Sequence, residues 1–393
     1  MRHLLTTLLV FAGTFIPTGC NYYDAVQHAV ATSFNHGPYD SSASHTTAED
    51  SLLLVKEHQL DSIFQRMHSH RGFNGTVLVA QKGDILYQEA FGYKNFRSRE
   101  KMDKDAIFQL ASVSKQFTAA AIMLLKQRGM LKYSDKVTSL LPGFPYSEEI
   151  TVKHLLTHRS GLPNYVYLAE EKIKDKDNPV NNQEMLKLFF EEKPSIYGQP
   201  DGKFYYNNTN YFLLACIVEK ISGISFSDFM QKEFFEPLEM QNTFVWNEEQ
   251  IQKHADQMTT GYSGRRKTFN PYFIDSVTGD KSVYSCTEDM FKWDMSLYSH
   301  TILNKETLEE AFNDSILETK RDRNYGFGYR LHHISDGSTV VFHGGWWRGY
   351  ATLFVHYPKN QTTLIVLSNY LNKSYVNLNS VLDLLEIPEF KRV

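Results

Sequence analysis

The sequence predicts an α+β fold: one antiparallel sheet flanked by helices, with an inserted helical lobe. Two observations carry this prediction. Apolar, strand-like segments lie near both ends of the 393-residue chain, and the stretch between them, at about 130–275, is helical or irregular with charged loops. Strands that are distant in sequence and separated by helices favour one sheet assembled from both ends of the chain, with helices packed on it.

The N-terminal residues have the pattern of an export signal. Arg2 precedes a short apolar run at 4–16, and small residues lead into Cys20. Such a run is too short to span a bilayer. We expect residues 1–19 to be a signal peptide. Cys20 is placed like the lipidated cysteine of a bacterial lipoprotein, which would anchor the protein at the outer membrane or leave it facing the periplasm. The alternative is an ordinary secretory signal in which Cys20 is incidental.

A polar linker then leads into the main domain. Residues 20–50 are polar, which suits a tether, so we place the domain at 51–393. Residues 52–70 are predicted to form a helix. Strands at 73–80 and 84–87 follow, and Lys82-Gly83 between them predicts a hairpin turn.

An amphipathic segment at 108–125 contains Ser112-Val113-Ser114-Lys115. We expect a helix that ends before Gly129. Its spacing brings the Ser112 hydroxyl and the Lys115 amine onto one face. A lysine among apolar residues is a candidate base that could activate the serine, because burial disfavours the charged amine. Taken alone, the pattern is common, and an ordinary helix start is the simpler interpretation.

Two further clusters follow in order along the chain. Tyr206-Asn207-Asn208 comes before an apolar helical run at 212–219, and His343-Gly344-Gly345-Trp346 follows an apolar strand that begins at 339. More strands are predicted at 351–357 and 362–369, joined by a turn at 358–361, and a helix at 375–385 closes the chain.

In combination, these clusters resemble the serine β-lactamase-related family, which includes class C β-lactamases, low-molecular-weight penicillin-binding proteins, D-aminopeptidases and certain esterases. Further segments resemble that family in the same order, over roughly residues 52–385: 73–80, 154–162, 284–289 and 325–328. The resemblance implies a β-lactamase/transpeptidase-like fold with the active site between the sheet and the helical lobe.

The resemblance also implies how the motif residues act. Ser112 is the expected nucleophile, and Lys115 and the Tyr206 phenol would handle its proton. The N–H groups of Ser112 and Trp346 would form the oxyanion hole. Asn208 would orient Lys115 or the substrate, or would merely cap a helix beginning near residue 210.

The third motif departs from that of class C β-lactamases, which have lysine where this chain has His343. Histidine is only partly charged at neutral pH. We therefore expect His343 to bind a β-lactam carboxylate more weakly than lysine would, and to bind it better on acidification. Gly344 and Gly345 would let a substrate backbone lie along the strand edge. Arg348 is a candidate carboxylate partner, with a structural ion pair as the equal alternative.

The predicted function is that of a serine hydrolase that cleaves an amide or ester of a small molecule or peptide through an acyl-enzyme. We rank peptidase or esterase activity above β-lactam hydrolysis. The alternatives are a β-lactamase, or a penicillin-binding sensor that is acylated without efficient turnover.

Other classes of function are disfavoured. A net charge of −4 without a long basic run argues against nucleic acid as a partner. His154 and His158 have zinc-like spacing on a predicted helix capped by Thr151, but no third ligand follows, so we expect no metal and no cofactor. Membrane contact is expected only through a lipid anchor at Cys20, and the sequence specifies no oligomeric state.

Overall fold

The computed structural model describes residues 48–313, 324–372, 378–388 and 390. The predicted signal peptide at 1–19, Cys20 and the tether as far as residue 47 lie outside these residues. The first described helix begins at Ala48, inside the range assigned to the tether. None of the helices in the described ranges has the length and apolar character needed to cross a membrane.

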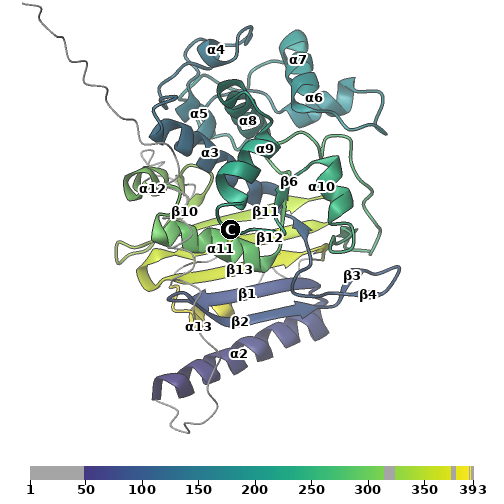
Figure 1. Ribbon diagram of the computed structural model, residues 1–393, viewed down its shortest axis with the longest axis vertical. Helices are drawn as coiled ribbons and strands as arrows, with labels where there is room; N and C mark the ends of the chain where they lie inside the picture. The colour runs from purple at the N-terminus through teal and green to yellow at the C-terminus, as the bar shows by residue number, and fades with distance from the viewer. Residues whose placement is uncertain (1–47, 314–323, 373–377, 389, 391–393) are drawn as a thin grey trace, which may run out of the picture. The chain divides into compact units, whose positions relative to one another are not determined.

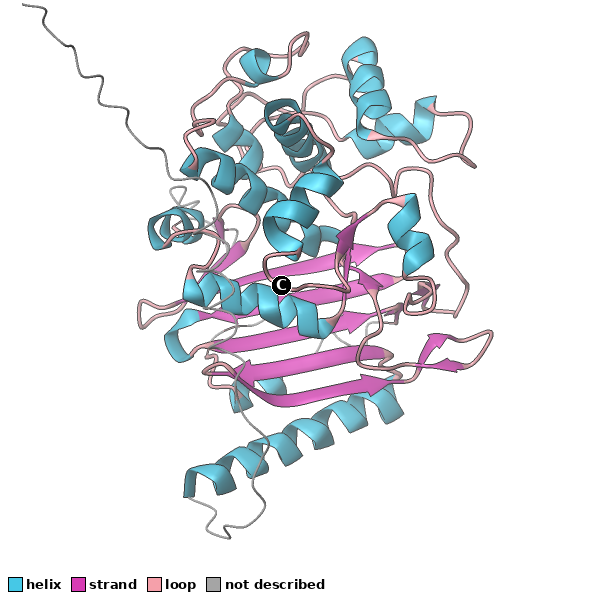
Figure 2. Cartoon of the chain, viewed as in Figure 1, coloured by secondary structure: helices cyan, strands magenta, loops and turns pink. Residues whose placement is uncertain are grey.

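Within the described ranges, seven antiparallel strands form the main sheet, in the order β2-β1-β13-β12-β11-β10-β9 (Figures 1 and 2). Their bounds are Gly75–Gln81 (β1), Asp84–Phe91 (β2), Asn324–Tyr325 (β9), Arg330–His333 (β10), Thr339–Trp347 (β11), Tyr350–Tyr357 (β12) and Thr362–Ser368 (β13). Strand β1 pairs with β13, with Val77 opposite Val366. The prediction of one sheet built from both ends of the chain is therefore confirmed.

Short strands lie outside this sheet: Tyr93–Asn95 (β3), Glu100–Lys101 (β4), Phe108–Gln109 (β5), Phe244–Val245 (β6), Tyr262–Ser263 (β7), Val283–Ser285 (β8) and Tyr370–Leu371 (β14). The helices that flank the sheet are Ala48–Arg71 (α2), Thr287–Ser299 (α11), Lys305–Phe312 (α12), Pro358–Asn360 (η3) and Asn379–Leu384 (α13). A further group of helices follows the first hairpin: Ala111–Ser114 (η1), Lys115–Gln127 (α3), Val137–Leu140 (α4), Val152–Leu156 (α5), Tyr165–Lys172 (α6), Asn182–Glu192 (α7), Asn208–Ser222 (α8), Phe226–Met230 (α9), Gln231–Phe235 (η2) and Glu248–Lys253 (α10).

The sheet buries both of its faces. Along β1, Leu78 belongs to a core shared with α3 and α8, whereas Val77 and Val79 belong to a second core shared with α2 and α13. Successive side chains of a strand point to opposite faces, so one apolar run serves both cores. Helix α2 lies along the outer face near β2 (Figure 1).

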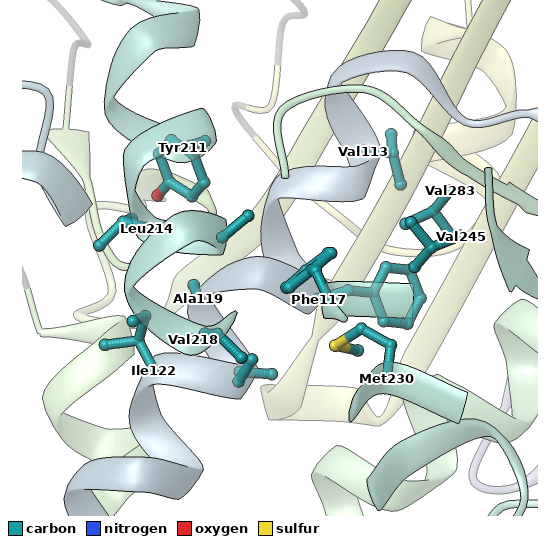
Figure 3. Close-up of a cluster of buried hydrophobic side chains, with 14 of the residues drawn as sticks. Val113, Phe117, Ala119, Ile122, Tyr211, Leu214, Val218, Met230, Val245 and Val283 are labelled. Carbon is teal, nitrogen blue, oxygen red and sulfur yellow. The ribbon is translucent and has the colours of Figure 1, made fainter. Parts of the chain in front are cut away.

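Helices α3 and α8 pack against each other and form the base on which the motif residues are carried. Phe117 and Ile122 of α3 and Leu214 and Val218 of α8 lie among the fully buried side chains of this core (Figure 3). Gly129, with a φ of 73°, follows the end of α3, as the sequence predicts.

Three predicted elements differ in their bounds. Residues 108–109 form strand β5 rather than the start of a helix, because Phe108 pairs with Ser285 of β8. The helix after the second motif begins at Asn208 rather than near residue 210, since Asn207 caps it. The closing helix is described only at Asn379–Leu384.

Candidate active site

The turn that carries Ser112 is held on both sides. Ala111, directly before it, has a φ of 50°, which is unfavourable for a residue with a Cβ. Leu110 donates its N–H to the carbonyl of Val283 at 2.8 Å, and its own carbonyl accepts from Thr352 Oγ1 at 2.7 Å. Ser112 lies in the first turn of η1, where backbone N–H groups have no intrahelical partner. This N–H can therefore serve an oxyanion.

Lys115 is fully buried, and its amine contacts three oxygen atoms. Nζ lies 3.2 Å from Ser112 Oγ, 2.9 Å from Asn208 Oδ1 and 2.8 Å from the carbonyl oxygen of Asp280. The last two oxygens can only accept hydrogen bonds. In its unprotonated form the amine has two N–H groups and one lone pair, so these two acceptors would leave the lone pair for the Ser112 hydroxyl. This arrangement would thus allow a proton to transfer from Ser112 Oγ to Lys115 Nζ.

The ring of Tyr206 lies next to this amine, with its centroid 5.0 Å from Lys115 Nζ. Within the described part of the chain, its phenol oxygen is buried and has no hydrogen-bond partner. An unpaired buried hydroxyl costs stability and calls for an explanation. Because its ring lies next to the amine that contacts Ser112, Tyr206 is a candidate for proton transfer to a departing group.

Asn207 and Asn208 have separate tasks. Asn207 caps helix α8, because its Oδ1 accepts the N–H of Thr209 at 2.9 Å. Capping by Asn207 leaves the amide of Asn208 free to contact Lys115. Of the two interpretations that the sequence left open for Asn208, the contact with Lys115 is the one observed.

The two histidines with zinc-like spacing do not share a helix. Helix α5 ends at Leu156, and the Nδ1 of His154 accepts the N–H of Thr151 at 3.3 Å within a capping box. His158 lies beyond the helix, has a φ of 57° and packs its ring 4.4 Å from that of Tyr206. The premise of a shared helical face was therefore wrong, and His158 instead supports the Tyr206 ring.

The expectation of a partly charged His343 was also wrong. His343 is buried, its Nδ1 lies 2.8 Å from the carbonyl of Gly344, and its Nε2 lies 3.0 Å from Tyr325 Oη. These partners fit a neutral ring that donates from Nδ1 and accepts at Nε2. Burial holds the pKa of His343 well below its usual value, and the nearby charges of Arg330 and Lys115 lower it further. The ring is neutral at physiological pH.

Gly345 is needed for close packing within the site and not for an open strand edge on which a substrate could lie. A Cβ at this position would lie 2.3 Å from the carbonyl oxygen of Leu110 and 2.1 Å from Thr352 Oγ1. Glycine is thus needed where the Ser112 turn meets β11, which differs from its expected role beside a substrate.

Trp346 lies near the end of β11, and the residue is 65% exposed. A two-residue turn joins β11 to β12, so Trp347 and Tyr350 form the hydrogen-bonded pair that flanks it. The next residue back, Trp346, then directs its N–H away from β12. Strand β10 pairs with β11 only as far as Phe342, so in the described strands this N–H faces an unpaired edge.

Arg348 occupies the turn between β11 and β12. Its guanidinium lies 4.1 Å from the ring centroid of Tyr272, and its Nη2 donates to the carbonyl of Asn270 at 3.1 Å. These contacts are with an aromatic ring and a backbone oxygen. Neither the expected structural ion pair nor a location beside Ser112 is found among the described contacts.

Sequence reasoning missed two residues of the site. Asp280 contributes its backbone carbonyl to Lys115, which no side-chain pattern could reveal. Arg330 lies with its guanidinium carbon 5.2 Å from the centroid of the Tyr206 ring. It follows the segment Tyr325–Gly328, whose resemblance to the family was the signal available for this neighbourhood.

Known proteins are similar to this chain over most of its length. The family model described as Beta-lactamase matches residues 60–385. Penicillin-binding protein 4* of Bacillus subtilis is 37% identical over 328 residues, which cover 80% of this chain and 72% of that protein. Among solved structures, the octameric penicillin-binding protein homologue from Pyrococcus abyssi has a TM-score of 0.72 and 26% identity, over 84% of this chain and 77% of that one.

A D-amino acid amidase from Ochrobactrum anthropi, at 21% identity, shares the fold with a TM-score of 0.68, over 86% of this chain and 99% of that one. Fold and family together define a serine hydrolase. The chain belongs to the beta-lactamase family.

Proposed function

We propose that this protein cleaves an ester or amide bond of a peptide-like substrate, with Ser112 as the nucleophile. As Ser112 Oγ attacks the carbonyl carbon, its proton moves to Lys115. The N–H groups of Ser112 and Trp346 hold the oxyanion. Tyr206 gives its phenolic proton to the leaving group as the bond to that group breaks, and the proton held by Lys115 then replaces it on Tyr206. Water then attacks the acyl-enzyme, and the acid product leaves with Ser112 regenerated.

The observation that carries this proposal is the set of contacts around Lys115. Its amine is buried, touches Ser112 Oγ and has two acceptor oxygens for its remaining N–H groups. The unpaired phenol of Tyr206 lies next to it. A lysine with a purely structural role could use the same two acceptors. It would not require a contact with the hydroxyl of Ser112, directly after the strained Ala111, or an unpaired phenol beside it.

The neutral state of His343 supports a peptide or ester substrate over a β-lactam. A penicillin has a rigid bicyclic frame that fixes its carboxylate relative to the reacting carbonyl. At the position of the third motif this chain offers a neutral, buried ring and hence no charge for that carboxylate. Flexible substrates can place their polar groups elsewhere, so we expect β-lactam hydrolysis to be slow.

The experiment compares wild type with Ser112→Ala, using a serine-directed fluorophosphonate, a chromogenic ester and a fluorescent penicillin. Wild type should be labelled by the phosphonate and should turn over the ester faster than the penicillin. The Ala variant should lose labelling and turnover and keep its circular dichroism spectrum. Turnover that survives in Ser112→Ala would refute the mechanism. Stable penicillin labelling without ester turnover would instead indicate a sensor, and faster penicillin hydrolysis a β-lactamase.

We further propose that the protein is exported and anchored by a lipid on Cys20. The support is the order of a positive residue, an apolar run at 4–16 and small residues before the cysteine. Radiolabelled palmitate should enter the wild-type protein and not Cys20→Ser. Equal incorporation into both would exclude this anchor, and no incorporation into either would favour an ordinary signal peptide.

A further inference from the structure

Three buried polar side chains beside the site form a network that the proposed mechanism does not use: Tyr165, Asp280 and Lys281. Lys281 Nζ donates to Tyr165 Oη at 2.5 Å and lies 3.2 Å from Asp280 Oδ1. Tyr165 Oη in turn lies 3.1 and 3.2 Å from the two carboxylate oxygens of Asp280. The carbonyl of Val277, at 3.3 Å, accepts the third hydrogen of the Lys281 ammonium, which is thereby fully used.

Stability alone does not explain this buried ion pair. Removing two charges from water costs free energy that their attraction often fails to offset, and apolar side chains of similar volume commonly serve the fold equally well. The location of the pair is more informative, because Asp280 also supplies the carbonyl oxygen that accepts a hydrogen bond from Lys115 at 2.8 Å. The network therefore borders directly on the group that is to activate Ser112.

The peptide group that carries this carbonyl is held from both sides. It joins Asp280 to Lys281, and the side chains of both residues converge on the phenol oxygen of Tyr165. The residue before it is fixed by the backbone: Thr118 of α3 donates to the carbonyl of Gly279 at 2.6 Å, and a Cβ on Gly279 would lie 2.3 Å from a backbone oxygen of α8. Those contacts leave the next peptide plane able to turn, and the convergence on Tyr165 removes that freedom.

Tyr165 is also connected to the second acceptor of Lys115. Its N–H donates to Thr209 Oγ1 at 2.7 Å, and Thr209 directly follows Asn208, whose Oδ1 accepts from Lys115 at 2.9 Å. One residue thus links the two acceptors that, together, decide in which direction the amine presents its lone pair. A small movement of either acceptor would turn that lone pair away from Ser112 Oγ.

We propose that Asp280, held by Tyr165 and Lys281, is a positioning residue that keeps the Lys115 amine aligned with Ser112. It acts through its backbone carbonyl and not on the substrate. Loss of the alignment should slow proton transfer and leave substrate binding unchanged, because the base acts in the chemical step. Asp280 and Lys281 carry opposite charges, so the alignment should depend on the hydrogen bonds of the network and not on a net charge. This inference rests on the proposed hydrolase function.

The test compares an apolar and a neutral polar form of the network on the chromogenic ester. The apolar variant, Tyr165→Phe/Asp280→Ala/Lys281→Met, removes the hydrogen bonds and leaves no buried charge unpaired. Its kcat should fall by roughly ten- to a hundredfold, with KM within about threefold of wild type. The polar variant, Asp280→Asn/Lys281→Gln, keeps hydrogen bonds to Tyr165 without the charges, so its kcat should stay within about fivefold of wild type.

Two single changes complete the set. Tyr165→Phe removes one hydroxyl and should lower kcat by roughly three- to tenfold, which provides a result even if the apolar variant does not fold. Asp294→Ala is the control: it removes an equally buried carboxylate whose partners lie on β12 and β13, and it should lower stability without changing kcat. A loss of kcat in this control equal to that of the apolar variant would overturn the proposal.

A second readout does not depend on turnover. In crystal structures, the distance from Lys115 Nζ to the carbonyl oxygen of residue 280 should exceed about 3.5 Å in the apolar variant and stay within hydrogen-bond range in the polar one. A normal kcat in the apolar variant or in Tyr165→Phe, a loss that lies in KM, or an equal loss in the polar variant would each overturn the proposal. If wild type does not cleave the ester, the hydrolase proposal fails, while the crystallographic distance still decides the role of Asp280.

Discussion

The charge of His343 is set by its surroundings. In water a histidine titrates close to neutral pH, but here the ring is buried, accepts a hydrogen bond from Tyr325 and lies near the guanidinium of Arg330. Each of these features favours the neutral ring. His158, whose ring packs against Tyr206, is also neutral, because burial holds its pKa well below the usual value and Lys115 lowers it further. In the proposed mechanism, proton transfer therefore falls to Lys115 and Tyr206.

These two histidines predict how stability depends on pH. Because their folded pKa values are depressed, the unfolded chain takes up protons below about pH 6.5 that the folded chain does not. The free energy of unfolding should fall as the pH drops from 7.5 to 5, at about 1.4 kcal/mol per pH unit for each such histidine once the pH is below 6.5. His343→Gln keeps an acceptor for Tyr325 and removes one of the two histidines. It should therefore reduce this slope by about 1.4 kcal/mol per pH unit. Urea unfolding at several pH values measures it, and parallel slopes in both proteins would contradict the assignment.

At the scale of elements, the site depends on how closely η1 approaches strand β11. The carbonyl of Leu110 lies against Gly345 and accepts a hydrogen bond from Thr352 of β12. Ser112 and Trp346, the two expected oxyanion donors, stand on either side of this contact. Its geometry therefore sets their separation.

Gly345→Ala should disturb this contact for steric reasons alone. The added Cβ would meet a backbone oxygen and Thr352 Oγ1 at distances that real structures do not tolerate, so η1 must move away from β11. We expect a loss of about 1–3 kcal/mol in stability and a fall in kcat of at least roughly tenfold from misplaced donors. Gly83→Ala, in the first hairpin turn with open space around it, is the control and should affect stability alone. A normal kcat in Gly345→Ala would show that η1 can move away from β11 without a loss of activity.

The sequence allowed most elements to be predicted but not the contacts between them. Apolar periodicity and turn residues correctly indicated α2, the first hairpin and strands β11–β13. The pairing of Phe108 with Ser285 was out of reach, because a two-residue strand depends on a partner distant in the chain. In the same way, burial of His343 comes from Tyr325, and the place of Arg330 comes from the fold of β9 and β10. Ser112, Lys115, Tyr206 and Asn208 could be singled out because each lies in a short local motif, and the structure brings them together.

At the scale of the whole described domain, the sheet separates two hydrophobic cores, and only one of them packs against the helices that carry the motif residues. One core lies between the sheet and the helices that carry the motifs, and includes Phe117. The other lies between the opposite face and α2, and includes Phe64 and Leu60. Stability and catalysis should therefore respond differently to changes in the two cores.

Phe64→Ala tests this separation. Phe64 is fully buried and stacks on Tyr87, so its loss should lower the free energy of unfolding by about 3–5 kcal/mol. The site is on the other face, so kcat of the folded protein should stay within about twofold of wild type. Denaturant unfolding and steady-state ester hydrolysis at 25 °C measure the two quantities. A drop in kcat comparable to that of Gly345→Ala would mean that the sheet transmits the change.

The pairing of β1 with β13 also bears on how the chain folds. Gly75 lies opposite Ser368, so this pair of inner strands joins residues roughly 290 positions apart. Closing so long a loop delays this pairing until nearly all of the chain is available. Until then one long edge of the first hairpin stays open to other chains, as do the apolar residues on both of its faces. The completed protein covers this edge inside its sheet, whereas a chain that is still incomplete leaves it open to pairing with other chains.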